Sequence, residues 1–157
     1  MKLKLIFIGK TDEAWLKEAI DKYLGRVRNY ISVELVVIQD IKNIGKKGID
    51  FQKEEEGRQI LRNIGQAEEV FLLDENGKEF SSEDFSVFLQ KKMNAGLKVL
   101  TLVIGGAFGF SNEVYTQVPN RLSLSKMTFS HQMVRLLLVE QLYRAFSILN
   151  NEPYHHR

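Results

Sequence analysis

The chain has 157 residues, of which 44% are hydrophobic and 27% charged, and its formal net charge is +2. This length and apolar content predict one domain, residues 1–157, with a real core. No cysteine occurs, which excludes disulfides and thiolate metal sites, and no run reaches the roughly 18–20 apolar residues that span a bilayer. We therefore expect a cytoplasmic protein without membrane contact.

Apolar patterns alternate between strand and helix spacing along the chain. In chain order we predict a strand at 2–9, a helix over 16–27, a strand at 31–38, a basic loop at 42–48, a helix at about 51–64, a strand at 70–73, a helix at about 82–94, a strand at 98–104, a short helix near 112–117, a strand at 121–124 and a final helix reaching about residue 149. Ser81 and Ser130 are the expected caps of the third and the last helix. Strands separated by helices predict an α/β fold, with a mostly parallel sheet and helices on both faces.

The stretch LVIGGAFGFS at 102–111 ends a predicted strand in three glycines within five positions. One glycine suffices for a residue at positive φ in a turn, and each further one costs backbone entropy. We therefore predict that a ligand approaches the backbone closely at Gly105 and Gly106.

Two nucleotide-binding motifs are incomplete. The sequence Gly9-Lys10-Thr11 is similar to the end of a phosphate-binding loop, but Lys4 stands where that motif needs its first glycine. The glycine turn has GGxxG spacing rather than GxGxxG, and no acidic residue follows at the distance expected for a ribose contact. A nucleotide-binding dehydrogenase is therefore the weaker alternative.

The final helix is apolar nearly all round, so it must be covered on all sides. We predict that one side meets the sheet and the other a second subunit, with Leu138 and Leu142 toward the partner; burial within one chain is the alternative. Glu140 and Arg144 are spaced to pair. Arg135 has no neighbour that cancels its charge, which makes it the better functional candidate.

The last residues read NNEPYHHR, and Pro153 ends the helix before them. Tyr154 and His155 make this tail a possible site. A metal site is weakly supported, because His155 and His156 are adjacent and no carboxylate cluster joins them. The distribution of charge along the chain shows no basic stripe like that of a free-standing nucleic-acid binder, although it allows a nucleic-acid partner.

Five segments together resemble the RlmH family of ribosomal RNA methyltransferases, small members of the SPOUT, or α/β-knot, class. They are KLKLIFIGKT, FLLDENGKEFSS, LVIGGAFGFS, LSLSKMTFSHQMVRLLLVEQLYRAFSI and NEPYHH, in this order. The resemblance implies a SPOUT-type α/β knot with a C-terminal trefoil knot. Phe108 departs from the family pattern, where a smaller or acidic residue is expected.

The same resemblance implies that S-adenosylmethionine binds at the carboxyl ends of the strands. The contacts that it implies, together with Gly106 from the glycine turn, are Leu73, Gly105, Leu124, Ser125, Lys126, Met127, Thr128 and Phe129. Without the resemblance, Leu73 and Leu124 would be read as core residues.

The activity that the resemblance implies is methylation at N3 of a pseudouridine in 23S rRNA, with no metal. We expect a homodimer with a composite site, and the assembled ribosome as substrate because the net charge is small. The expected roles are His155 as proton acceptor or positioning group, Tyr154 as a stacking platform and Arg135 as a phosphate contact. The alternative is a non-catalytic knot protein that binds RNA or the ribosome.

Overall fold

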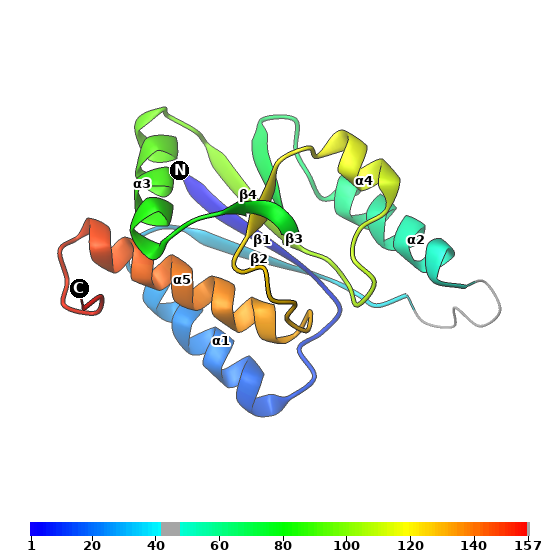
Figure 1. Cartoon of the computed structure of the whole chain (residues 1–157), viewed down its shortest axis with the longest axis horizontal. Helices are drawn as coiled ribbons and strands as arrows, with labels where there is room; N and C mark the ends of the chain where they lie inside the picture. Colours follow the sequence, from blue (N-terminus) through cyan, green and yellow to red (C-terminus); the bar gives the residue numbers. More distant parts are fainter. Residues whose placement is uncertain (42–47, 157) are drawn as a thin grey trace.

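The computed structural model describes residues 1–41 and 48–156 and contains a five-stranded parallel sheet with strand order β2-β1-β4-β3-β5 (Figure 1). The strands are β1 (Lys2–Ile8), β2 (Val33–Ile38), β3 (Glu68–Glu79), β4 (Val99–Ile104) and β5 (Arg121–Ser123). The helices are α1 (Ala14–Val27), α2 (Gly48–Arg62), α3 (Ser82–Asn94), α4 (Asn112–Gln117) and α5 (Met133–Leu149). The predicted α/β class and parallel sheet are confirmed.

Alternation along β1 divides the core into two layers. Leu5 and Phe7 pack with apolar residues of α1, α3 and α5, whereas Ile6 and Ile8 pack with residues of α2 and α4. Side chains of a strand point to opposite faces in turn, so one buried strand feeds both layers. Helices therefore cover both faces of the sheet, as predicted (Figure 1).

Strand β3 is longer than the predicted 70–73. It runs to Glu79 because its second part pairs with β5: Leu122 is opposite both Leu73 and Lys78, with a register shift between these two residues. Gly77 lies in this irregular part, and a Cβ there would stand 2.6 Å from backbone atoms of Leu122. The polar sequence ENGKE at 75–79 is typical of a loop, but pairing with β5 extends the strand through it. The trefoil knot stays a prediction.

The first residues of α3, α5 and α2 can be compared with the predicted helix starts. Ser81 caps α3 by accepting from the Asp84 amide (3.0 Å), as expected. Ser130 accepts from the Met133 amide (3.1 Å) across the turn that leads into α5, so the regular helix begins at Met133. Of the predicted 42–48 loop, 42–47 lie outside the described residues, and Gly48 already opens α2.

Helix α5 packs against α1 and α3 over the sheet (Figure 1). Leu138 and Leu142 are 0% exposed and belong to the core. The prediction that these two leucines face a partner subunit is wrong, because the chain's own helices cover that side of α5. In the part of the chain that the structure describes, no helix is long and apolar enough to cross a membrane.

Candidate functional site

A cavity of about 670 Å³ lies at the carboxyl ends of β4 and β5 and beside residues 73–76 in the middle of β3. Its walls come from the irregular middle of β3, the glycine turn after β4, and the segment between β5 and α5. The predicted cofactor residues that line it are Leu73, Gly105, Gly106, Leu124, Ser125, Met127, Thr128 and Phe129. Lys126 is not among the lining residues. The volume lies in the range of small-molecule sites.

The protein itself accounts for the three glycines of the turn. A Cβ at Gly105 would stand 3.1 Å from the Phe110 ring, and one at Gly106 would stand 2.5 Å from Glu56 Oε2. Gly109 has φ +75°, which favours glycine. Side chains of this chain thus fill the space that a Cβ would need at Gly105 and Gly106, which is a second reason for glycine there. Both glycines line the cavity, and the close approach of a ligand to them stays a prediction.

Exposed apolar side chains form the rim of the cavity. The Gly109 amide donates to the Gly106 carbonyl (3.2 Å), and this tight turn presents Phe108, which is 47% exposed. Met127 and Phe129 are exposed on the opposite segment. The departure from the family pattern at Phe108 therefore affects the cavity mouth rather than the core.

Two carboxylates line the cavity directly after the regular part of β3. Asp74 accepts from the Tyr115 hydroxyl (2.5 Å) and the Asn76 amide (2.8 Å), and Glu75 accepts from the Thr128 hydroxyl (2.7 Å). Burial alone would raise the pKa of Asp74, but the Tyr115 and Asn76 hydrogen bonds lower it below its usual range. Asp74 and Glu75 were not predicted as site residues, although the polar run DEN directly after an apolar strand indicated them.

His131 also lines the cavity and was not predicted as a site residue. It is partly buried at the entry to α5. Burial lowers the pKa of His131, and the charge of Arg135 lowers it further, while Asp40 and Asp12 oppose the shift. The imidazole is therefore neutral at physiological pH.

Arg135 is 0% exposed and ties α5 to the end of β1. Its guanidinium donates to the carbonyls of Ile8 (2.5 Å) and His131 (3.0 Å) and to the Thr11 hydroxyl (3.0 Å). It also lies over the Phe7 ring, 5.3 Å from its centre. This geometry does not support the predicted phosphate contact, because no surface of Arg135 is open to RNA.

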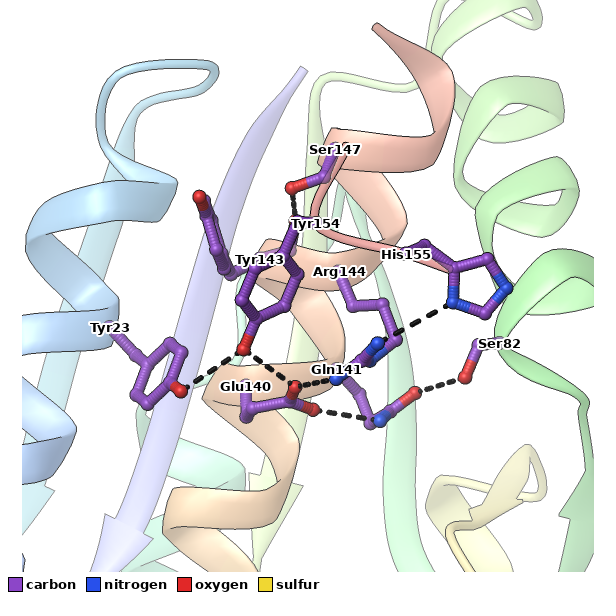
Figure 2. A network of polar contacts seen from close by, with 9 residues as sticks. All are labelled: Tyr23, Ser82, Glu140, Gln141, Tyr143, Arg144, Ser147, Tyr154 and His155. Carbon is purple, nitrogen blue, oxygen red and sulfur yellow. Dashed lines mark hydrogen bonds and ion pairs between the residues drawn. The ribbon is translucent and has the colours of Figure 1, made fainter. Parts of the chain in front are cut away.

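Tyr154 and His155 fold back onto α5 (Figure 2). The Tyr154 hydroxyl lies 3.1 Å from that of Tyr23 and donates to Glu140 Oε1 (3.0 Å). Arg144 pairs with Glu140, as its spacing predicted, and donates to His155 Nδ1 (3.4 Å). Burial raises the pKa of Tyr154, and its contacts with Tyr23 and Glu140 raise it further.

The cavity and the tail lie at opposite ends of α5. His131 and Val134 line the cavity at the start of the helix, whereas Tyr154 and His155 follow its end and do not line it. The 17 residues of α5 span about 25 Å at 1.5 Å per residue. Within one chain, the structure therefore does not bring the predicted catalytic tail to the predicted cofactor residues.

No group of three or more His, Asp or Glu side chains placed to hold a metal occurs among the described residues. The cavity instead combines apolar walls at Ile104 and Leu122 with hydroxyls, backbone groups and the carboxylates of Asp74 and Glu75. Such a set suits a ligand with an aromatic ring, a sugar and a positive charge.

A family model described as "Predicted SPOUT methyltransferase" matches residues 1–155. Proteins named "Ribosomal RNA large subunit methyltransferase H" from Christiangramia forsetii and Parabacteroides distasonis are 55% and 53% identical to this chain, over 100% and 99% of both sequences respectively. Among solved structures, the tRNA (m1G37) methyltransferase from Aquifex aeolicus superposes with a TM-score of 0.57 at 14% identity, over 100% of this chain and 75% of that chain. That structural likeness supports the fold alone.

Proposed function

The chain belongs to the SPOUT methyltransferase family, and from this premise we propose that it methylates N3 of a pseudouridine in 23S rRNA with S-adenosylmethionine. We include in the proposal that residues 1–157 act as one domain, on the assembled ribosome in the cytoplasm. The observation that carries it is that all the implied cofactor contacts except Lys126 line one cavity, although they come from segments far apart in the sequence. The names of the full-length relatives point to the same substrate class.

The residues of the cavity fit the methyl donor. When bound, S-adenosylmethionine supplies a methyl group made electrophilic by the adjacent sulfonium. The apolar wall of Ile104 and Leu122 suits adenine, and the ionised Asp74 can accept hydrogen bonds or face a positive charge. The protein's main task is then alignment of nucleophile, carbon and sulfur.

The direct test incubates the protein with methyl-labelled S-adenosylmethionine and either ribosomes or free rRNA. We expect label in 23S rRNA, at the N3 of pseudouridine, with ribosomes as the better substrate. Ribosome binding without transfer would support the non-catalytic alternative, and binding of NAD in place of S-adenosylmethionine would support a dehydrogenase.

Because the cavity and the tail are separated within one chain, the proposal includes a homodimer in which the partner's tail completes each site. Tyr154 would then offer a surface for base stacking, and His155 would position the base. Alanine at either position should reduce turnover far more than cofactor affinity. Equal losses in both would place the tail in the cofactor site.

Subunit mixing tests the shared site. Gly105→Val should abolish cofactor binding, since its side chain would strike the Phe110 ring, and His155→Ala should abolish turnover. A heterodimer of the two variants keeps one cavity and one tail that are both intact and belong to the same site. Random mixing should therefore restore about a quarter of wild-type activity in a two-fold dimer. A mixture that stays inactive would contradict the shared site.

A further inference from the structure

Two histidines are candidates for the proton acceptor in the proposed reaction, and the structure distinguishes them. Methylation at N3 removes the proton that N3 carries, so a group beside the base must take it. His131 lines the cavity of its own chain, whereas His155 lies beyond the far end of α5 and would reach a cavity only in a partner subunit.

The ring nitrogens of His155 already have partners. Nδ1 accepts from Arg144 (3.4 Å), and Nε2 lies 4.0 Å from Glu83 Oε1. In the neutral ring the lone pair is therefore on Nδ1 and directed at the Arg144 guanidinium. His155 must lose this contact before it can accept a proton from a base.

His131 keeps its lone pair available. Its Nε2 has one near polar atom among the described residues, the Gln132 amide nitrogen at 3.5 Å. That amide has two hydrogens, and it donates them to the Lys10 carbonyl (3.0 Å) and Asp12 Oδ2 (3.1 Å). The contact at 3.5 Å therefore does not occupy the lone pair of the imidazole.

The surroundings keep His131 neutral. It sits at the N-terminal entry to α5, where the helix dipole disfavours a positive charge, and burial and Arg135 lower its pKa in the same direction. Asp12 and Asp40 are the opposing charged groups that face it. The lowered pKa favours the unprotonated ring, which can act as a base.

We propose that His131 accepts the N3 proton of the target base, which makes it a catalytic residue in the cavity of its own subunit. The N3–H bond breaks and the proton goes to a ring nitrogen of His131. The electron pair left on N3 forms the bond to the methyl carbon, and the carbon–sulfur bond breaks with its pair returning to sulfur as a neutral thioether. This step rests on the proposed function.

The first experiment is an NMR titration of the three histidines, with His131→Gln to identify the resonance. We expect His131 to titrate below 6.5 in the protein without substrate. Titration at or above 6.5 would overturn the inference. This readout does not depend on activity.

The second experiment measures single-turnover methyl transfer to ribosomes between pH 5 and 8, with calorimetry of S-adenosylmethionine binding alongside. The wild-type rate should fall as pH drops through the pKa of His131. His131→Asn should slow transfer by about 10²- to 10⁴-fold, abolish this acid limb, leave cofactor affinity within about twofold and recover partly with added imidazole. The matched control is His156→Asn, an exposed tail histidine, which should behave as wild type.

A rate within about threefold of wild type, a parallel loss of cofactor binding, or an acid limb that disappears in His155→Asn instead would each overturn the inference. If wild-type protein transfers no methyl group, the proposed function fails, and this is seen before any variant is made.

Discussion

The two arginines of α5 show how differently the two ends of this helix are built. Arg135, beside the cavity, is 0% exposed and donates to the end of β1 and to Thr11. Arg144, beside the tail, is partly exposed and contacts Glu140, His155 and the Tyr154 ring. The first arginine joins elements of the core, and the second joins surface groups to one another.

This difference separates a preformed site from an adjustable one. The inner wall of the cavity, at Ile104 and Leu122, consists of core residues that stay in place as long as the chain is folded. The tail is held by part-buried contacts between hydroxyl, carboxylate and guanidinium groups (Figure 2), rather than by the apolar core. We infer that the cavity is ready before substrate arrives and that the tail adjusts on binding.

The largest expected effect comes from exchanging each arginine for alanine. Arg135→Ala should lower the free energy of unfolding by about 2–5 kcal/mol, because it opens a cavity and leaves the Ile8 carbonyl without its donor. Arg144→Ala should cost less than about 1 kcal/mol, as expected for a partly exposed ion pair. Urea denaturation measures the free energy of unfolding of both variants. Equal losses of stability would contradict the difference between the two ends of α5.

A second contrast concerns Gly77 in β3 and Gly25 on α1. Alanine at Gly77 would press on the Leu122 backbone, so we expect a loss of about 1–3 kcal/mol and weaker S-adenosylmethionine binding, since the neighbouring Asp74 and Glu75 line the cavity. Gly25 has nothing within 4 Å of its Cβ position. Gly25→Ala should therefore stabilise the helix by about 0.5–1 kcal/mol. Thermal melting and calorimetry would show whether Gly77→Ala is instead tolerated.

The sequence order of strands, helices and glycine turn was predictable because each depends on local spacing and local residue type. The contact between Gly106 and Glu56 was not predictable, since Glu56 is far from Gly106 in sequence and only folding brings its carboxylate there. Arg135 is a similar case: its acceptor at Ile8 lies 127 positions earlier.

The final helix shows a different limit of pattern reasoning. An apolar helix must be covered, but its sequence does not say by what. Here α1 and α3 of the same chain cover Leu138 and Leu142, so these two residues belong to the core and not to an interface with a partner. Most of the predicted cavity residues came from the family resemblance. Asp74 and Glu75 had a usable signal in the DEN run, whereas only the folded chain shows that His131 lines the cavity.

The smallest expected effect is a pH dependence of the free energy of unfolding, caused by the buried Glu56 of α2. Burial raises the pKa of Glu56, and the charge of Asp40 raises it further, while the Gln52 hydrogen bond lowers it. A raised folded-state pKa adds stability below the unfolded value of 4.5, and this stability is lost as pH rises through the folded value.

Glu56→Gln removes that titration. The variant should therefore gain stability relative to wild type as pH increases from about 4.5 toward 8, in urea denaturation at each pH. Glu18→Gln, on the exposed face of α1, is the control and should track wild type. If the difference in the free energy of unfolding between Glu56→Gln and wild type does not change with pH, the pKa of Glu56 is not raised by folding.

The sheet order also has a consequence for synthesis of the chain. β1 leaves the ribosome well before its neighbour β4, which ends at Ile104, about 96 residues after Ile8. At about 5–20 residues per second, one edge of this apolar strand stays unpaired for about 5–20 s of translation. During this interval β1 can pair wrongly with other chains or be held by a chaperone, and its second edge becomes protected only when the segment before the glycine turn has emerged.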